Sequence, residues 1–361
     1  MEPFTISPDL AVAATPPREL YTTADAFRLA IERAFQPGWH FAMERTEPAA
    51  PFTPATLLPG ALDQPLLFTH EAGATRCFAN VCTHRGARLC DAPASTRTIA
   101  CPYHGRRFGL DGLMRHAPGF EGAQAFPSAS DDLAPIAHGA LGPALFARAE
   151  GDLGFDAWMG PLRARLGWLP FDALRFVPEA SKDWALDASW ALYCDNYLEG
   201  MHVPFVHPAL SRALDLGAYY TELFPWGTLQ IGFAREGDPA PVFDPPAGAP
   251  EHGRRVAAYW AWLFPGTMLN FYPWGLSVNV VTPVAVARTL VRYVSFAWDL
   301  SLRDVGAGGD LDQVEREDQA IVLAVQAGLA SRAYGRGRYA PLHERGVHHF
   351  HRLLARAMFG A

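Results

Sequence analysis

Two short segments, each with one cysteine and one histidine, constrain this chain more than any other feature of its sequence. The first reads Cys82-Thr-His84 and the second reads Cys101-Pro-Tyr-His104, and a glycine lies just past each histidine. Glycine permits a tight turn and lets backbone amides approach a bound group closely. Four side chains of metal-binding type on two turns therefore predict that the turns meet around one metal centre.

Two kinds of metal centre use two cysteines and two histidines. In the Rieske form of a [2Fe–2S] cluster, two thiolates hold one iron and two imidazoles hold the other. In a structural zinc site, all four side chains hold a single ion. Zinc fingers place their cysteines close together in one segment and their histidines in another, whereas here each turn carries one of each. This grouping favours the Rieske cluster.

The segment DNYLEGMHVPFVH, from Asp195 to His207, holds a second group of candidate ligands. A helix carrying Asp195 is expected to be interrupted at Pro204, which lets His202 and His207 converge although they are five residues apart. Two imidazoles and one carboxylate on one face of an Fe(II) leave positions open for dioxygen and substrate. Alone, two such histidines would be ordinary residues near a helix end. Downstream of the Cys–His turns, we interpret them as iron ligands.

The carboxylate ligand must come from elsewhere in the chain. Residues 313–329 predict a long helix, and Asp318 lies on its apolar face together with Val314, Ile321, Val322 and Val325. An ionised carboxylate on such a face is costly unless it is paired or bound to a metal. Glu317 is the competing candidate, one position round the helix, and Glu315 is expected to be solvated.

Composition limits the remaining classes of function. The chain has 361 residues, half of them apolar, and a net charge of −7, which argues against a general nucleic-acid surface. No apolar run is long enough for a membrane span, and no secretory signal is visible. The cysteines outside the two turns are expected as buried thiols in a reducing compartment. These features predict a cytoplasmic protein without membrane or nucleic-acid partners.

The pattern of strands, helices and turns predicts an α+β chain with three parts. Residues 1–37 form an arm and a helix, over residues 24–35, capped by Thr22 or Thr23. Residues 38–150 read as short strands broken by Pro and Gly, with the metal turns at their tip. Residues 151–361 alternate in the manner of an antiparallel sheet with flanking helices, and should hold the second iron.

The motifs CTHRGARL and CPYHGRRFGLDG resemble the Rieske domain of Rieske non-haem iron oxygenases, the alpha subunits of ring-hydroxylating systems. This resemblance implies a small β-sandwich Rieske domain with Cys82, His84, Cys101 and His104 as cluster ligands, and a catalytic domain of the helix-grip type. The segment EREDQAIVLAVQAGL resembles the helix that carries the third iron ligand in this family, which selects Asp318. One departure is Arg106, where many of these oxygenases have Trp.

The family also implies a role for Glu199, three residues before His202. An acidic residue at this position lies between a cluster histidine of the neighbouring subunit and a histidine of the mononuclear iron. Most members have Asp there, and Glu occurs in the branch that acts on carnitine- and choline-like quaternary amines. A surface glutamate is the alternative. Asp195 and Asn196 are expected to support the helix or the ligands.

Two further stretches, MLNFYPWGLSVNVVTP and residues 332–358, are similar to the choline- and carnitine-monooxygenase-like branch. Aromatic side chains in the predicted strands are candidates for a wall that attracts a quaternary ammonium group by cation–π contact: Tyr259, Trp262, Phe271, Tyr272 and Trp274. The alternative for each of them is a place in the core. The terminal cluster of His348, His349 and His351 is expected at the surface or in an interface.

The resemblance implies a terminal oxygenase in which the cluster relays electrons to Fe(II), and O2 is used to hydroxylate or demethylate a small organic substrate. No dinucleotide-binding G-x-G-x-x-G motif is present, so NAD(P)H is expected to act only through a separate reductase, with or without a ferredoxin. The family also implies a homotrimer. The competing functions are ring dihydroxylation of an aromatic compound, and a non-enzymatic electron carrier or redox sensor.

Overall fold

A computed structural model of the protein describes residues 1–47 and 49–360. The chain divides into two compact units. One unit joins Met1–Trp39 to the chain from Asp152 onward, and the other is His40–Gly151. The mixed α/β architecture expected from the sequence is confirmed.

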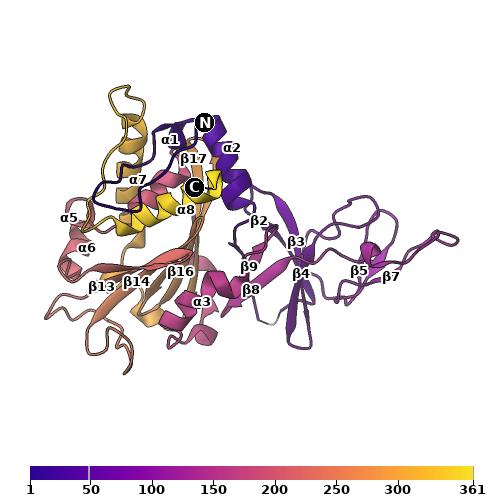
Figure 1. The fold of residues 1–361 in the computed structure, drawn as a ribbon. Helices are drawn as coiled ribbons and strands as arrows, with labels where there is room; N and C mark the ends of the chain where they lie inside the picture. Colours follow the sequence, from indigo (N-terminus) through magenta and orange to yellow (C-terminus); the bar gives the residue numbers. More distant parts are fainter. Residues whose placement is uncertain (48, 361) are drawn as a thin grey trace. The chain divides into compact units, whose positions relative to one another are not determined.

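The smaller unit consists of short antiparallel strands in three sheets, which Figure 1 shows in indigo to magenta. The sheets are ordered β1-β9-β8, β2-β3-β4 and β5-β6-β7. Their strands are β1 (His40–Glu44), β2 (Phe52–Leu57), β3 (Gln64–Glu71), β4 (Ala74–Ala79), β5 (Ile99–Ala100), β6 (Arg107–Phe108), β7 (Met114–His116), β8 (Ala137–Leu141) and β9 (Ala144–Arg148), with a 3-10 turn at Ala129–Asp131. Cys82 and Cys101 belong to a core cluster that includes Phe78 and Phe108. The core therefore reaches the metal turns and anchors them.

The larger unit is built on one antiparallel sheet in the order β10-β17-β16-β15-β14-β13-β12, with β11 pairing β17. Its strands are β10 (Arg175–Phe176), β11 (Lys182–Leu186), β12 (Tyr220–Phe224), β13 (Gly227–Phe233), β14 (Val256–Leu263), β15 (Thr267–Tyr272), β16 (Gly275–Ala285) and β17 (Arg288–Ala297). Strands β13 to β16 are almost entirely buried. Burial on both faces requires helices or loops on each side of the sheet.

The helices supply this cover. They are α1 (Glu19–Thr22), α2 (Ala24–Ala30), α3 (Phe155–Leu166), α4 (Trp190–Tyr197), α5 (Val203–Val206), α6 (Pro208–Ala213), α7 (Leu311–Gly328) and α8 (Arg345–Phe359), with 3-10 turns at Phe171–Ala173, Pro178–Ala180, Leu300–Leu302 and Gly306–Gly308. In Figure 1, α7 and α8 lie on one side of the sheet and α3 on the other. Helix α8 packs the Phe350 ring 5.2 Å from that of Trp262, on β14. The site described below lies on the α7 side.

Local signals place the ends of several helices. Thr23 caps α2 by accepting a hydrogen bond from the Ala26 amide, and helical structure continues to Phe35 as a π-helical turn. The expected helix and its cap are thus confirmed. Helix α7 begins at Leu311, after the N-cap Asp310, which accepts a hydrogen bond from the Gln313 amide. No helix in the described residues is both long and apolar enough to cross a membrane.

Candidate metal centres

The two Cys–His segments form two turns of the same local design. In each, the cysteine carbonyl accepts a hydrogen bond from a glycine amide, Gly86 to Cys82 at 3.0 Å and Gly105 to Cys101 at 3.1 Å. Both glycines have φ of +71°, a conformation that only glycine adopts readily. The cysteines are buried, whereas His104 is exposed. The sequence of each turn therefore fixes a cysteine pointing inward and a histidine pointing outward.

The four donor atoms converge as two pairs. The Nδ1 atoms of His84 and His104 are 3.1 Å apart, and the Cys82 and Cys101 thiols hydrogen-bond to one another. Burial opposes ionisation of Cys101, but the amides of Tyr103 and His104 outweigh it and lower the pKa of this thiol. One cysteine is thus already disposed to bind a metal as a thiolate.

The separation of the two pairs distinguishes a cluster from a single ion. One tetrahedral zinc would bring all four donor atoms within about 4 Å of one another. Among the described residues, there is one group of three candidate ligands whose donor atoms all lie within 4.8 Å of one another, and it lies outside these two turns. A sulfur pair set apart from a nitrogen pair fits two irons, one held by each pair.

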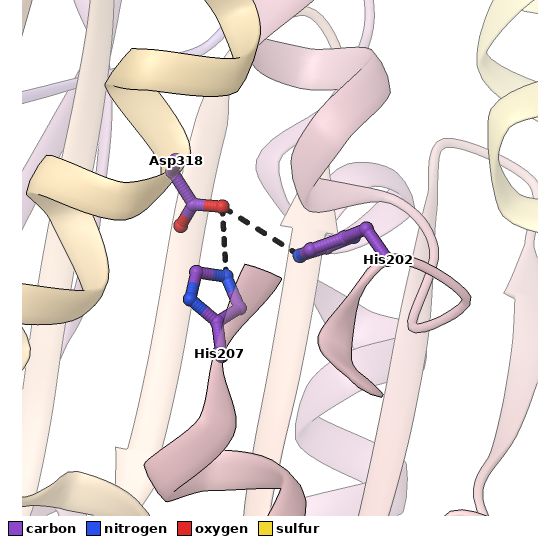
Figure 2. A group of neighbouring side chains, drawn as sticks. All are labelled: His202, His207 and Asp318. Atoms are coloured by element: carbon purple, nitrogen blue, oxygen red, sulfur yellow. Dashed lines mark hydrogen bonds and ion pairs between the residues drawn. The ribbon is translucent and has the colours of Figure 1, made fainter. Parts of the chain in front are cut away.

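The second group of ligands comes together in the larger unit, as Figure 2 shows. His202 lies just before α5, His207 lies between α5 and α6, and Asp318 projects from α7. Asp318 Oδ1 is 2.9 Å from His207 Nε2 and 3.6 Å from His202 Nε2. Donor atoms of all three residues lie within 4.8 Å of one another. Two imidazoles and a carboxylate in this arrangement can hold one face of an Fe(II) ion.

The chain turns earlier than Pro204, where the sequence predicted the interruption. Helix α4 ends at Tyr197, and Pro204 lies in the first turn of α5. Proline is well tolerated there because the first turn of a helix has amides without intrahelical acceptors. The two histidines therefore sit at the two ends of α5, which is only four residues long.

Each histidine is held from behind by a carboxylate. His202 Nδ1 lies 2.6 Å from Glu199 Oε1, and His207 Nδ1 lies 2.7 Å from Glu317 Oε2. A carboxylate on Nδ1 fixes the ring orientation and leaves Nε2 for the metal. Glu317, weighed above as a competing ligand, lies behind His207 instead. Glu317 directly precedes Asp318, so its side chain points about 100° round the helix from that of Asp318. This offset is the signal that could have suggested a position behind His207.

Asp318 and Glu199 are themselves positioned by neighbours. Asn196 Nδ2 donates a hydrogen bond of 2.5 Å to Asp318 Oδ1. Glu199 Oε2 accepts hydrogen bonds from the amides of His202, at 3.1 Å, and of Met201. Because both partners of Glu199 are local, its carboxylate is held by the turn that carries His202.

The electrostatics of the site favour a bound cation. Burial alone would lower the pKa of His207, but hydrogen bonds and charges from Asp318 and Glu317 outweigh it and raise this pKa. A metal ion competes with that proton for Nε2, so metal binding at this site releases a proton.

Glu315 is buried, contrary to the expectation that it would be solvated. Its carboxylate is fully inaccessible and accepts hydrogen bonds from the Tyr193 hydroxyl at 2.7 Å, from Gln319 Nε2 at 2.7 Å and from the Tyr293 hydroxyl. Burial raises the pKa of Glu315 to about 6, against the opposing effect of these bonds. The prediction was wrong because Glu315 and Asp318 are three residues apart and so share one helix face.

Asp195 supports the structure around the site. Its carboxylate accepts a hydrogen bond of 2.9 Å from the Tyr21 hydroxyl and lies 2.8 Å from His351 Nε2. Tyr339 contacts the other nitrogen of His351 at 2.7 Å. Asp195 thus ties α4 to α1 and α8, and these contacts make it a supporting residue.

The terminal histidines are not surface groups. His348 and His351 are buried, and His349 Nε2 lies 2.8 Å from the Phe224 carbonyl oxygen. The expectation of a surface cluster was wrong because α8 packs over the sheet, so its histidines face the body of the unit. Each engages a different partner, which argues against a shared metal.

A cavity adjoins the three candidate ligands. Aromatic rings line much of it: Tyr193, Tyr197, Tyr219, Trp260, Tyr272 and Tyr293. Neutral polar side chains cover another part: Asn196, Asn270, Ser277 and Asn279. The histidine and carboxylate side chains that the cavity touches in the described chain are those of His202, His207, Glu199 and Asp318. Such a surface suits a small ligand that is apolar in part and positive in charge.

Of the five aromatic residues predicted to form this wall, the structure places only Tyr272 at the cavity. Tyr259 pairs with Phe271 across β14 and β15, whereas Trp260 pairs with Asn270. Successive side chains of a strand point to opposite faces, so Tyr259 and Phe271 face away from the cavity that Trp260 and Asn270 line. The prediction that Tyr259 and Phe271 line the substrate cavity was therefore wrong, because both point to the other face of the sheet.

The remaining two predicted aromatic residues are also core residues. Trp262 is fully buried and packs edge-on against Phe350 of α8. Trp274 stacks on Tyr272, with 5.6 Å between ring centroids, and supports it from behind. The sequence missed Trp260, Tyr219 and the three amide or hydroxyl side chains of β15 and β16.

Comparison with known proteins agrees with both sites. Residues 58–127 match the Rieske [2Fe-2S] domain, and residues 171–360, over half of the chain, match the ring hydroxylating alpha subunit (catalytic domain). Chloroplastic choline monooxygenase of Arabidopsis thaliana is 30% identical, over 95% of this chain and 82% of its own length. The carnitine monooxygenase oxygenase subunit of Escherichia coli K12 is also 30% identical, over 95% of this chain and 93% of its own.

Solved structures share the fold. A quaternary ammonium Rieske monooxygenase, studied for carnitine oxidation and inter-subunit electron transfer, superposes with a TM-score of 0.77 at 23% identity, over 99% of this chain and 100% of the other. Naphthalene 1,2-dioxygenase from Rhodococcus sp. superposes with a TM-score of 0.71 at 18% identity, over 96% and 94% of the two chains. The chain belongs to the ring-hydroxylating alpha-subunit family and is a Rieske terminal oxygenase, which uses O2 with a [2Fe–2S] cluster and a mononuclear iron.

Proposed function

We propose that this oxygenase acts on a small quaternary amine, with His202, His207 and Asp318 holding the mononuclear iron. The observation that carries the substrate assignment is the cavity beside these residues, with its aromatic rings, neutral polar groups and carboxylates. A quaternary ammonium has no N–H to donate, so rings and negative charge are the groups that recognise it. The relatives named for choline and carnitine support the same class.

When bound, the cluster supplies single electrons and the mononuclear iron activates O2. The protein's own residues orient the reaction. Glu199 and Glu317 hold the two imidazoles, Asn196 holds the carboxylate of Asp318, and the aromatic wall places a C–H group of the substrate next to the metal position. The aromatic lining of the cavity also limits the access of water to the reacting atoms.

The test is oxygen uptake by the holoenzyme with a suitable reductase and NAD(P)H. Choline and carnitine are compared with naphthalene and with 3,3-dimethylbutanol, a neutral compound of the same shape as choline. We expect a quaternary amine to stimulate uptake and to yield a hydroxylated or demethylated product, while the neutral isostere binds poorly. Uptake and product formation with naphthalene alone would instead establish ring dihydroxylation.

We further propose that the chain assembles as a homotrimer in which the cluster of one subunit feeds the mononuclear iron of its neighbour through Glu199. Two observations support this proposal: His104 is exposed, and Glu199 is hydrogen-bonded to His202. A cluster histidine is therefore open to contact by another subunit, and Glu199 already contacts a candidate iron ligand. Family members work with a reductase, and for this chain we expect one that draws on NAD(P)H. A cytoplasmic location fits that supply of electrons.

Complementation tests the bridge between subunits. Cys101→Ser removes a cluster ligand, and His207→Ala removes an iron ligand, so each variant alone should be inactive. In a random mixed oligomer, about a quarter of the junctions join an intact cluster to an intact iron, so about a quarter of the activity should return. Electron transfer within one chain predicts no recovery. A mixture of each variant with itself is the control.

A further inference from the structure

A buried arginine lies directly against the two cluster turns. The Arg106 side chain is only 3% exposed. Its Nη1 donates hydrogen bonds to Thr83 Oγ1 at 3.0 Å and to Asp131 Oδ1 at 3.4 Å. Thr83 stands between Cys82 and His84, and the Arg106 carbonyl accepts a 2.8 Å hydrogen bond from the Cys101 amide. Arg106 therefore contacts both turns.

Aromatic rings hold the guanidinium in place. It lies 4.7 Å from the centroid of Phe120 and 5.5 Å from that of Phe126, and these two rings stack on one another. The edge of Phe120 also meets the ring of His84, with 5.2 Å between centroids. A flexible surface arginine would swing into solvent, but this one is fixed by two hydrogen bonds and two rings.

One donor of this arginine has no partner in the chain. The Nε of Arg106 is buried and reaches no hydrogen-bond acceptor among the described residues. A buried donor without an acceptor is unfavourable, so its presence beside a metal site points to an acceptor on the bound group. The sulfur atoms of an iron–sulfur cluster are such acceptors.

The counter-ion of Arg106 does not cancel its charge at the cluster. Asp131 is 18% exposed, and its carboxylate is also bonded to the amide of Ser128. Solvent screens a partly exposed charge more than a buried one. The buried cation therefore dominates the field that the pair exerts on the two turns.

We propose that Arg106 is a positioning and tuning residue that raises the reduction potential of the cluster. Reduction adds one electron from the reductase, and hence one negative charge, to the cluster. A fixed cation stabilises that reduced form more than the oxidised form, because net charge and hydrogen bonds to sulfur set the potential. This inference concerns the cluster alone and does not depend on the identity of the substrate.

The test is a spectroscopic redox titration of the cluster in the holoenzyme. In Arg106→Gln, which removes the charge, we expect the midpoint to fall, so that at the wild-type midpoint the ratio of reduced to oxidised cluster drops on the order of tenfold, or about 59 mV for one electron. Arg106→Lys keeps the charge and should retain most of the wild-type potential. Asp131→Asn removes the counter-ion and should shift the midpoint upward. Arg107→Gln, at the exposed neighbouring position, is the matched control.

The signs of these shifts decide the proposal. A merely structural arginine predicts that both Arg106→Gln and Asp131→Asn leave the midpoint unchanged or move it in the same direction, and either result overturns the tuning role. If Arg106→Gln fails to hold its cluster, Asp131→Asn still decides. Its upward shift should be smaller than the fall expected for Arg106→Gln, because solvent partly screens Asp131, and a midpoint that falls or does not move overturns the proposal. A shift in Arg106→Gln that persists at high salt supports it, because buried charges are screened little by salt.

Discussion

The two metal sites of this chain are built in opposite ways. The histidines of the cluster turns are 20 residues apart and lie on two turns of one design, each closed by a glycine. In the second site, 111 residues separate His207 from Asp318, and α7 must pack against α4 and α5 to bring them together. The first site depends on local turn geometry, and the second depends on tertiary packing.

The surroundings of the histidines differ as well. His104 is exposed, as suits a group that meets another subunit or a redox partner. His207 is 2% exposed on its side chain, and both of its nitrogens face carboxylates. An electron relay needs access from outside, whereas a centre that handles O2 benefits from enclosure. The sites should therefore respond differently to substitution.

The largest effect should come from removing one ligand of either site. We expect His207→Ala to abolish mononuclear iron binding and to reduce turnover by at least about 1000-fold, since a metal supplies several kcal/mol of transition-state stabilisation. The visible spectrum of the cluster should survive. Cys101→Ser should show the reverse, with loss of the cluster spectrum and retention of the other iron. Loss of both centres in either variant would mean that the sites are not independent.

A smaller effect should follow when a carboxylate behind a histidine is changed. Glu317→Gln keeps a hydrogen-bond acceptor near His207 Nδ1 but removes the charge, so we expect iron affinity to fall by about 10- to 100-fold. Iron content after dialysis against a graded chelator measures this affinity. Asp318→Asn, one residue away, is the matched comparison and should bind no iron. Equal loss in both variants would show that Glu317 is itself a ligand.

Glu315 offers a pH-dependent test of the tertiary site. Its pKa is raised from 4.5 to about 6 by burial, so the folded state keeps the proton while the unfolded state loses it. The free energy of unfolding should therefore fall as the pH rises between these two pKa values, by about 2 kcal/mol in total, and stay lowered above pH 6. Glu315→Gln cannot titrate and should lack this fall. Urea unfolding from pH 4 to pH 7, after removal of the mononuclear iron, gives the difference between the two proteins.

The smallest effect is expected at Asn196. Asn196→Ala removes the hydrogen bond to Asp318 but leaves all three ligands in place. The loss of one such bond to a charged group is worth about 1.5–3 kcal/mol at most, and bound iron should restore part of the orientation. We expect a several-fold loss of iron affinity with an unchanged cluster spectrum. An affinity equal to that of the wild type would show that Asp318 needs no such support.

Sequence by itself determined the features that short-range geometry controls. The spacing in Cys82-Thr-His84 and Cys101-Pro-Tyr-His104, with glycines at positive φ, specifies two inward sulfurs and two outward imidazoles. Helical periodicity put Asp318 on an apolar face. Thr23 marked the start of a helix by its capping hydrogen bond. Each of these signals acts over a few residues, so no knowledge of the packing is required to interpret it.

Only the tertiary structure decided which side chains surround the second site. The parity of β14 and β15 put Trp260 and Asn270 at the cavity and turned Tyr259 and Phe271 away, and a shift of one residue would reverse this choice. Packing of α7 placed Glu317 behind His207 and buried Glu315 against Tyr193 and Tyr293. Two of these contacts, Glu317 with His207 and Glu315 with Tyr193, join residues more than a hundred positions apart. Their register is set by the whole core, since local sequence carries no information on which distant surface a side chain will meet.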